Sequence, residues 1–301
     1  MNTKSGYVAI IGKPNVGKST LMNALLGERL SIVTNKPQTT RKRVLGILSD
    51  ENYQMIFLDT PGLLEPSYLL QRKLLDFIEN SVKDADVLVV IIDILKDPNG
   101  EKTLRDEKMQ KIIKSEKPKI LLINKIDKSN EEILSALVSK IESKKIFDRV
   151  IPISATEKFN IKSVQEAILD FLPEGPKYFP DDQITDEPER FFVSEIIREK
   201  IFENYKEEVP FSTEVVIEEF SERESRKDFI SASIIVERET QKPIIIGKRG
   251  EAIKKIGKIA REAIENFLQR EVFLELRVKV KPKWRNDKRM LKSFGYDKEN
   301  E

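Results

Sequence analysis

A phosphate-binding motif near the start of the chain restricts the fold more than any other feature of this sequence. Residues 12–19 are Gly-Lys-Pro-Asn-Val-Gly-Lys-Ser, which matches the pattern G-x-x-x-x-G-K-[ST]. The apolar run Tyr7–Ile11 precedes the motif, and a stretch with helical spacing, Ser19–Leu26, follows it. A loop between a buried strand and a helix turns backbone N–H groups toward an anion, and the helix N-terminus adds positive potential. The motif therefore predicts a nucleoside triphosphate site on an α/β sheet.

Short apolar runs alternate with amphipathic stretches as far as residue 173. The runs are rich in Ile, Val and Leu, as strands buried on both faces are. The apolar runs are Tyr7–Ile11, Val44–Leu48, Gln54–Leu58, Val87–Ile92, Lys119–Ile123 and Arg149–Ile153, and helical spacing is found in Ser19–Leu26, Leu69–Val82, Leu104–Ile113, Ile133–Ile141 and Ile161–Phe171. This alternation predicts an α/β P-loop domain with a mixed, mostly parallel sheet. The tight turn between the second and third runs predicts an antiparallel hairpin at the sheet edge.

Residues suited to the phosphates and to a metal ion follow the first and third runs. Lys18 supplies a charge to the β- and γ-phosphates, and Ser19 supplies a hydroxyl ligand to Mg²⁺. The sequence Asp-Thr-Pro-Gly at 59–62 follows the third run, where a carboxylate can hold the Mg²⁺ shell. Gly62 can bring its N–H close to a γ-phosphate because no side chain obstructs the approach.

Two later motifs indicate guanine as the base. Asp127, in Asn-Lys-Ile-Asp at 124–127, can accept hydrogen bonds from guanine N1–H and N2–H₂, which adenine lacks. Asn124 can hold the outer edge of the base, and the Lys125 stem can cover its face. In Ser-Ala-Thr at 154–156, the N–H of Ala155 can reach guanine O6. Each motif lies at the carboxyl end of an apolar run, where open α/β sheets bind ligands. Asp127 argues against the alternative of an ATPase.

Together these motifs resemble those of a Ras-like GTPase domain of the translation-factor-related class. Pro37-Gln38-Thr39-Thr40-Arg41 resembles the switch I region of the Era family, in which a Thr closes over Mg²⁺; we expect Thr40 to do so here, with Thr39 as the alternative. The resemblance implies catalytic roles for Lys18, Thr40 and Gly62 and metal ligands in Ser19, Thr40 and Asp59. It implies nucleotide contacts from Gly12, Asn15, Val16, Gly17, Lys18, Ser19, Thr20, Asp59, Gly62, Asn124, Lys125, Asp127, Ser154, Ala155 and Thr156.

The site lacks a residue that activates water. Ras-like enzymes that orient the attacking water with Gln place it directly after the glycine of the second motif, and this chain has Leu63 there. An aliphatic side chain cannot polarise water, and the 301 residues contain no His. We therefore expect slow intrinsic hydrolysis of GTP. Asn15 leaves two interpretations open, since related GTPases with Asn at this position bind K⁺ beside the phosphates, whereas loop Asn residues commonly cap their own backbone.

The alternation of apolar runs and amphipathic stretches ends at residue 173. We expect a linker at 174–189, because prolines recur at 173, 176, 180 and 188. Residues 190–301 then predict a smaller α+β domain. Its expected elements are a helix at 191–205, strands at 210–220 and 227–236, a helix at 251–268, a strand at 272–280 and a short helical end at 286–296.

A Gly-Lys-Arg-Gly sequence at 247–250 lies within this second region. With Ile245, Ile246 and Ile253 it has the form I-I-G-x-x-G-x-x-I, which resembles the loop with which KH domains clamp about four nucleotides of single-stranded nucleic acid. The order of elements resembles a type II KH domain. The expected RNA-binding residues are Ile246, Gly247, Lys248, Arg249, Gly250, Ile253, Lys254, Lys281, Lys283, Trp284 and Arg285, although Trp284 is as well explained by packing against the last strand.

Over essentially its whole length the chain resembles the Era family of bacterial GTPases. The resemblance implies Mg²⁺, GTP or GDP, and K⁺ as ligands and the 3′ end of small-subunit ribosomal RNA and the small ribosomal subunit as partners. It also implies a monomer that acts in small-subunit assembly, located in the cytoplasm and in part in weak peripheral contact with the inner membrane. Two alternatives remain open: an RNA-binding module with a structural GTP site, and a GTPase of another RNA-modification or translation step.

The charge distribution agrees with an RNA partner. The net charge is only +2, yet residues 1–173 carry 27 basic and 23 acidic side chains, residues 174–241 carry 9 and 19, and residues 242–301 carry 17 and 9. The positive segment contains the Gly-Lys-Arg-Gly loop, so its affinity for nucleic acid should fall with salt. There is no Cys, which excludes disulfides and thiolate chemistry, and no signal-peptide pattern at the start.

Overall fold

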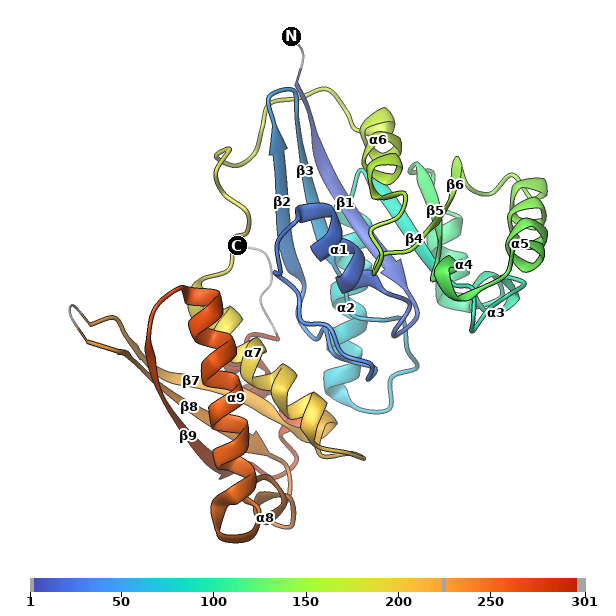
Figure 1. The fold of residues 1–301 in the computed structure, drawn as a ribbon. Coiled ribbons are helices and arrows are strands. Elements are labelled where there is room, and N and C mark those ends of the chain that lie inside the picture. The colour runs from blue at the N-terminus through green and yellow to red at the C-terminus, as the bar shows by residue number, and fades with distance from the viewer. Residues whose placement is uncertain (1–2, 224–225, 297–301) are drawn as a thin grey trace. The chain divides into compact units, whose positions relative to one another are not determined.

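The computed structural model describes residues 3–223 and 226–296. These residues divide into two compact units (Figure 1). The first unit holds residues 3–65 and 74–186, and the second holds 66–73 and 187–296. Within the described parts of the chain, no helix is long and apolar enough to cross a membrane.

The first unit is built on a six-stranded sheet in the order β2-β3-β1-β4-β5-β6. Its strands are β1 (Lys4–Gly12), β2 (Val44–Asp50), β3 (Tyr53–Asp59), β4 (Val87–Asp93), β5 (Lys119–Asn124) and β6 (Arg149–Ile153). β2 pairs antiparallel with β3 at the edge, and all other pairs are parallel. The mixed, mostly parallel sheet and its edge hairpin are thus confirmed.

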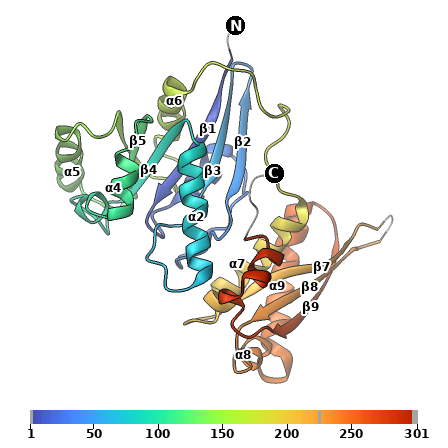
Figure 2. The same ribbon diagram turned by 180° about the vertical axis from the view of Figure 1, so that it is seen from behind.

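Helices flank this sheet (Figures 1 and 2). They are α1 (Lys18–Leu26), α2 (Leu69–Asp84), α3 (Glu101–Leu104), α4 (Glu107–Ile113), α5 (Glu131–Ser143) and α6 (Ile161–Phe171). The single helix expected at 104–113 is wrong. Asp106 interrupts it because its carboxylate accepts the N–H groups of Lys108 and Met109 and so begins a new helix, α4.

Strand register brings the four sequence motifs to one edge of the sheet. Ile10 of β1 lies opposite Asp59 of β3, and Gly12 lies opposite Ile91 of β4. Asn124 of β5 lies opposite Asp93 on one side and Ile153 of β6 on the other. Because these strands run parallel, their carboxyl ends share this edge, which is where a ligand of an α/β sheet binds.

The proline-rich segment after α6 is packed against the first unit. Gln54, fully buried in β3, accepts the N–H groups of Tyr178 and Phe179 at 2.8 and 3.0 Å and donates to the carbonyl of Phe179 at 2.8 Å. Farther along, the N–H of Ile47 in β2 donates to the carbonyl of Ile184 at 2.9 Å. These backbone and side-chain bonds give the segment a defined path despite its composition.

The second unit has a three-stranded sheet in the order β7-β8-β9. Its elements are α7 (Glu189–Asn204), β7 (Glu214–Ser221), β8 (Asp228–Val236), α8 (Gln241–Ile246), α9 (Glu251–Leu268), β9 (Val272–Val280) and α10 (Lys288–Ser293), with short 3₁₀ turns at Pro210–Ser212, Lys248–Gly250 and Trp284–Asn286. The expected α+β order is confirmed. The strand expected from residue 210 begins only at Glu214, because Pro210 starts a 3₁₀ turn.

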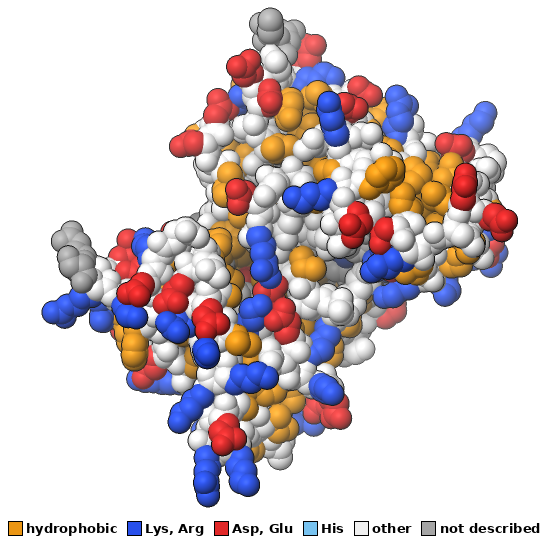
Figure 3. Space-filling model, viewed as in Figure 1, with side chains coloured by type: hydrophobic (Ala, Val, Ile, Leu, Met, Phe, Trp, Pro, Cys, Tyr) orange, Lys and Arg blue, Asp and Glu red, His pale blue; other side chains and the backbone are white. Residues whose placement is uncertain are grey.

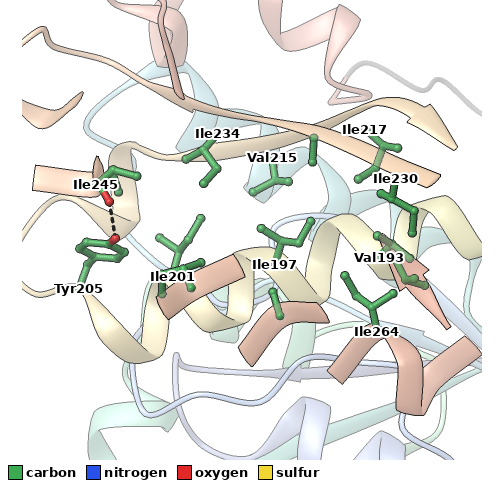
Figure 4. Close-up of a cluster of buried hydrophobic side chains, with 14 of the residues drawn as sticks. Val193, Ile197, Ile201, Tyr205, Val215, Ile217, Ile230, Ile234, Ile245 and Ile264 are labelled. Atoms are coloured by element: carbon green, nitrogen blue, oxygen red, sulfur yellow. Dashed lines mark hydrogen bonds between the residues drawn. The ribbon is translucent and has the colours of Figure 1, made fainter. Parts of the chain in front are cut away.

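The core of the second unit lies between this sheet and the helices α7 and α9 (Figure 4). Ile197 and Ile201 of α7 and Ile264 of α9 face Ile230 and Ile234 of β8, and all five side chains are fully buried. Tyr205 closes one end of this core, where its hydroxyl donates to the carbonyl of Ile245 at 2.7 Å. The alternation of apolar residues along β8 and β9 therefore assigns one sheet face to the core and leaves the opposite face for polar and aromatic side chains.

Candidate functional site

The loop between β1 and α1 has the backbone geometry of a phosphate cradle. Asn15 and Gly17 adopt positive φ angles of 63° and 106°, and α1 begins at the next residue, Lys18. A Cβ at Gly17 would lie 2.2 Å from Nδ2 of Asn124, so glycine is required there for space as well as for conformation. The loop thus presents free N–H groups at a helix N-terminus, as an anion site needs.

Lys18 is held inside this loop. Its Nζ donates to the carbonyls of Gly12 and Lys13 at 3.2 and 3.1 Å, and its side chain is buried. Burial lowers the pKa of Lys18 to about 8, while the nearby Asp59 carboxylate opposes this shift. The ammonium is still charged at neutral pH and is available to phosphate oxygens.

Ser19, Thr40 and Asp59 converge on one point. The Oγ of Ser19 donates to Oδ2 of Asp59 at 2.8 Å and lies 2.8 Å from Oγ1 of Thr40. Oδ1 of Asp59 is buried without a hydrogen-bond partner among the described residues. Burial raises the pKa of this carboxyl, so a cation beside it would favour the ionised form. Two hydroxyls and a carboxylate are hard oxygen ligands, and they fit Mg²⁺.

The geometry distinguishes Thr40 from its alternative. The Thr39 hydroxyl is already used, since it lies 2.6 Å from Oγ1 of Thr34 and donates to the carbonyl of Lys36 at 2.7 Å. The Thr40 hydroxyl instead points to Ser19 and Asp59. Thr40 is therefore the switch I residue placed for a metal ion.

Gly62 and Leu63 follow β3 and touch the phosphate loop. A Cβ on Gly62 would lie 2.7 Å from backbone atoms of Pro14, and the N–H of Leu63 donates to the carbonyl of Gly12 at 3.0 Å. The Leu63 side chain is only 6% exposed and packs in the core of the first unit. Leu63 therefore has a structural role and does not face a position for water.

Asn124 organises the base end of the site. Its Nδ2 donates to the carbonyl of Val16 at 2.7 Å, and its Oδ1 accepts the N–H of Ala155 at 3.0 Å. Lys125 donates through Nζ to the carbonyl of Asn15 at 2.9 Å and pairs with Asp93 at 2.6 Å. These bonds join the phosphate loop to the ends of β5 and β6.

The remaining base-site residues differ in exposure. Asp127 and Thr156 are exposed, so the Asp127 carboxylate is accessible to a base, whereas Ser154 and Ala155 are buried. In this structure the Ala155 N–H is taken by Asn124, and its contact with guanine O6 stays a prediction. Val16 is buried under the loop, and Thr20 is half-buried in α1.

Two contacts of this site were not expected from the sequence. Asp93 pairs with Lys125. The sequence feature that could have identified Asp93 is its position at the end of an apolar run, which Asp59 shares. The side chain of Asn15 donates to the carbonyl of Asn35 in the switch I region at 2.7 Å, which joins the phosphate loop to the segment that contains Thr40.

The Gly-Lys-Arg-Gly loop of the second unit is also set by glycine geometry. Gly247 has φ 73° and ψ 174°, and a Cβ there would lie 2.5 Å from the Cβ of Ala252. Gly250 has φ 79° and precedes α9. Lys248 and Arg249 are exposed between the two glycines. Figure 3 shows Lys and Arg side chains gathered at the end of this unit where Figure 1 places α8.

Around this loop the expected RNA contacts are available at the surface. Lys254 on the first turns of α9 is exposed, and Ile246 and Ile253 are half-buried. Lys281 and Lys283 are exposed beyond β9. These side chains can meet phosphates and bases without a change in the core.

The expectation that Trp284 stacks on a base is wrong. Its side chain is fully buried, its Nε1 donates to the carbonyl of Ser212 at 2.9 Å, and its ring meets Phe294 edge-on at 5.6 Å. Arg285 is half-buried and pairs with Glu237, so its guanidinium is not a free phosphate ligand. Both residues hold the C-terminal segment on its unit.

Comparison with known proteins gives two matching families. Residues 7–125 match the family described as 50S ribosome-binding GTPase, and residues 197–285 match the KH domain family. The GTPase Era of Alkaliphilus metalliredigens is 44% identical over 300 residues, which is 99% of this chain and 100% of that protein. The GTPase Era of Geotalea daltonii is 45% identical, covering 97% of this chain and 98% of its own length.

Solved structures agree with these relatives. A crystal structure of Era in complex with MgGDPNP and nucleotides 1506–1542 of 16S ribosomal RNA is 44% identical, with a TM-score of 0.91 and coverage of 98% of this chain and 99% of the other. A variant of Aquifex aeolicus Era bound to GDP and AlF₄⁻ is 42% identical with the same TM-score and coverage.

Proposed function

The chain belongs to the Era family of GTPases, and from this premise we propose that it acts in small ribosomal subunit assembly as a GTP-controlled binder of the 3′ end of small-subunit ribosomal RNA. The observation that carries the proposal is that one chain joins a complete guanine-nucleotide site to an exposed Gly-Lys-Arg-Gly loop. The relative solved with MgGDPNP and a 16S ribosomal RNA fragment supports both halves.

The proposal assigns each residue of the site a role in nucleotide binding. The loop N–H groups and Lys18 hold the β- and γ-phosphates, and Asp127 accepts the guanine edge. Ser19, Thr40 and Asp59 hold Mg²⁺, which neutralises charge on the phosphates when it is bound. Gly62 donates its N–H to the γ-phosphate. Asn124 and Lys125 act through the phosphate loop as well as on the base.

We propose that intrinsic hydrolysis is slow. Catalysis here rests on positioning and charge, because Leu63 is buried and no His is present anywhere in the sequence. Asn15 offers one further device, since a K⁺ ion beside its side chain would add positive charge at the phosphates. K⁺ would bind the Oδ1 oxygen of this side chain, whose Nδ2 donates to the carbonyl of Asn35 in this structure. Hydrolysis that is equally fast in K⁺ and Na⁺ would end the K⁺ proposal.

Nucleotide state controls RNA binding in this proposal. GTP draws Thr40 and Gly62 to the metal and the γ-phosphate, and hydrolysis releases them. Residues 66–73 follow this switch directly in the chain and group with the second unit, which gives the switch a covalent route to the RNA-binding part. We propose that residues 1–173 form the GTPase domain, 174–189 the linker, most of which packs on the first unit, and 190–301 the KH-like domain.

The cellular setting is also a proposal. We infer a cytoplasmic monomer that binds the small ribosomal subunit and makes weak peripheral contact with the inner membrane. The basic segment after residue 241 supports an anionic partner, because it carries 17 basic and 9 acidic residues.

The test is RNA binding measured with a non-hydrolysable GTP analogue and with GDP. The wild type is compared with a Lys248→Glu, Arg249→Glu double variant, using an oligonucleotide with the 3′-terminal small-subunit sequence. We expect tighter binding with the analogue and a loss of binding in the double variant. The matched control is Lys288→Glu with Lys292→Glu on α10, two exposed lysines outside the loop. Equal RNA affinity in all protein and nucleotide combinations would refute the gated-binding proposal.

A further inference from the structure

The sheet face opposite the core of the second unit carries an aromatic pair at one corner. Phe229 of β8 and Phe273 of β9 are cross-strand partners in the parallel register. Their rings stack at 5.9 Å between centroids with an interplanar angle of 14°. Phe273 is 57% exposed, although burying such a ring would be favourable by ~2 kcal/mol. The stacked pair therefore offers an exposed planar surface on which another flat group can lie.

A guanidinium group extends this stack. Arg223, which follows β7, places its Cζ 4.9 Å from the centroid of the Phe229 ring. The planar groups therefore come from the segment after β7, from β8 and from β9. β9 is an edge strand, so the series ends at the ring of Phe273. One more planar group can continue the stack there.

A pocket whose lining includes four basic side chains lies beside the aromatic pair. Its lining residues are Arg223, Arg226, Lys227, Asp228, Arg270 and Glu271, which are four basic and two acidic side chains. Arg270 is used within the unit, since it pairs with Glu189, Glu222 and Asp228. Arg226 and Lys227 remain at the rim, and Lys227 is only loosely paired with Glu271 at 3.6 Å. The rim can therefore accept phosphate groups.

We propose that this corner is a second binding site for single-stranded RNA, in which a base stacks on Phe273 and the flanking phosphates meet Arg226 and Lys227. Stacking on an aromatic ring together with nearby cations is how proteins hold unpaired nucleotides without reading their sequence. The inference rests on the proposed RNA-binding function and extends it to a surface outside the Gly-Lys-Arg-Gly loop.

The helix α9 sets the distance between the two sites. The loop ends at Gly250, where α9 begins, and Arg270 and Phe273 follow its other end. With 18 residues, α9 is about 27 Å long. A KH loop clamps about four nucleotides, so an RNA that reaches both sites must be longer than the segment in the loop. The second site thus predicts a footprint on RNA that extends well beyond the loop.

The test uses the full-length protein with two single-stranded RNAs, one of four nucleotides and one of about twenty. Phe273→Ala should weaken binding of the long RNA by about five- to a hundredfold, the range for loss of one stacked base. It should leave the short RNA unaffected, and Phe273→Tyr should restore affinity because it keeps the ring. Arg226→Ala with Lys227→Ala should lower the salt dependence of the long RNA, whereas Lys292→Ala, an exposed charge on α10, should change neither the affinity nor the salt dependence.

The outcomes separate this inference from the proposed function. If the wild type binds the long RNA and Phe273→Ala binds it equally well while remaining folded by circular dichroism, the second site is refuted and the corner is a surface for a protein partner. If the wild type binds neither RNA, the proposed RNA-binding function itself fails. Because Phe273 is more than half exposed, its replacement should leave the thermal unfolding transition near that of the wild type.

Discussion

Replacing Gly62 by Ala tests how closely the switch must approach the phosphate loop. The added Cβ would lie 2.7 Å from both Cα and N of Pro14, although Cβ atoms essentially never lie within 3.0 Å of another non-bonded heavy atom. Gly62 is not among the residues with positive φ, so backbone strain contributes nothing and the effect comes from this contact alone. To reach an ordinary contact distance, the segment at 60–63 must move by roughly 0.7 Å, because β1 and α1 hold the loop on both sides.

That displacement acts on hydrolysis more than on GDP binding. It moves the Gly62 N–H away from the γ-phosphate and strains the 3.0 Å bond between Leu63 N–H and the Gly12 carbonyl. Misplacement by about 1 Å can reduce a rate about a hundredfold, so we expect a ten- to hundredfold lower hydrolysis rate. GDP lacks the γ-phosphate, and its affinity should change by less than about threefold.

The assay is single-turnover hydrolysis at saturating protein, together with titration of a fluorescent GDP. Gly175→Ala is the matched control, because a Cβ at Gly175 meets nothing within 4 Å and should leave both quantities unchanged. If Gly62→Ala hydrolyses GTP within twofold of the wild type, the close approach of Gly62 to Pro14 has no catalytic role and the reasoning is refuted.

Five other predictions follow from the positions of buried and site residues. Lys18→Ala should abolish nucleotide binding in an equilibrium titration. Leu63→Ala should keep the hydrolysis rate within a few fold of the wild type and lower the free energy of unfolding by about 2–4 kcal/mol in a denaturant series, because Leu63 is buried. A hundredfold lower kcat of Leu63→Ala with intact nucleotide binding would contradict the second prediction. Asp127→Asn should shift preference from guanosine to xanthosine nucleotides in competition binding, and an unchanged preference would show that Asp127 does not contact the base. Nucleotide affinity should fall as pH rises above about 8. Lys18 has a pKa of about 8 in the protein without nucleotide, and a bound phosphate raises this pKa, so the complex holds the proton more tightly. An affinity that stays constant from pH 7 to 9.5 would contradict this prediction. Trp284→Phe should lower the free energy of unfolding by about 1–3 kcal/mol without a direct effect on RNA contacts, since it leaves the buried Ser212 carbonyl without its donor. Weaker RNA binding at unchanged stability would contradict this prediction.

The fold followed from the sequence where a residue pattern has one structural solution. Short apolar runs bounded by glycine and acidic residues predicted the six strands of the first sheet, because their length and their Ile, Val and Leu content fit buried strands. The predicted helix bounds were wrong where a side chain competes for backbone hydrogen bonds. Asp106 divided an expected helix because its carboxylate caps backbone N–H groups better than it tolerates a helix interior.

Site residues could be predicted where a short motif in the sequence specifies them, and they were missed where their position depends on tertiary packing. Lys18, Ser19 and Asp59 could be identified because each follows a strand end in a known spacing. Trp284 could not be placed, because a basic neighbourhood suits both a stacking surface and a buried anchor. The pair of Phe229 and Phe273 depends on a strand register between residues 44 positions apart, which no local pattern specifies.

The packing of the proline-rich segment changes where the chain can be divided. Gln54 and the edge strand β2 hold residues through Ile184, so a fragment that ends at residue 173 would expose the buried amide of Gln54 and remove its partners. A fragment that ends at residue 186 keeps them, and the division between the two units falls there. For dissection experiments and for limited proteolysis, the cleavable boundary should therefore lie near Asp186, and the prolines before it should be protected.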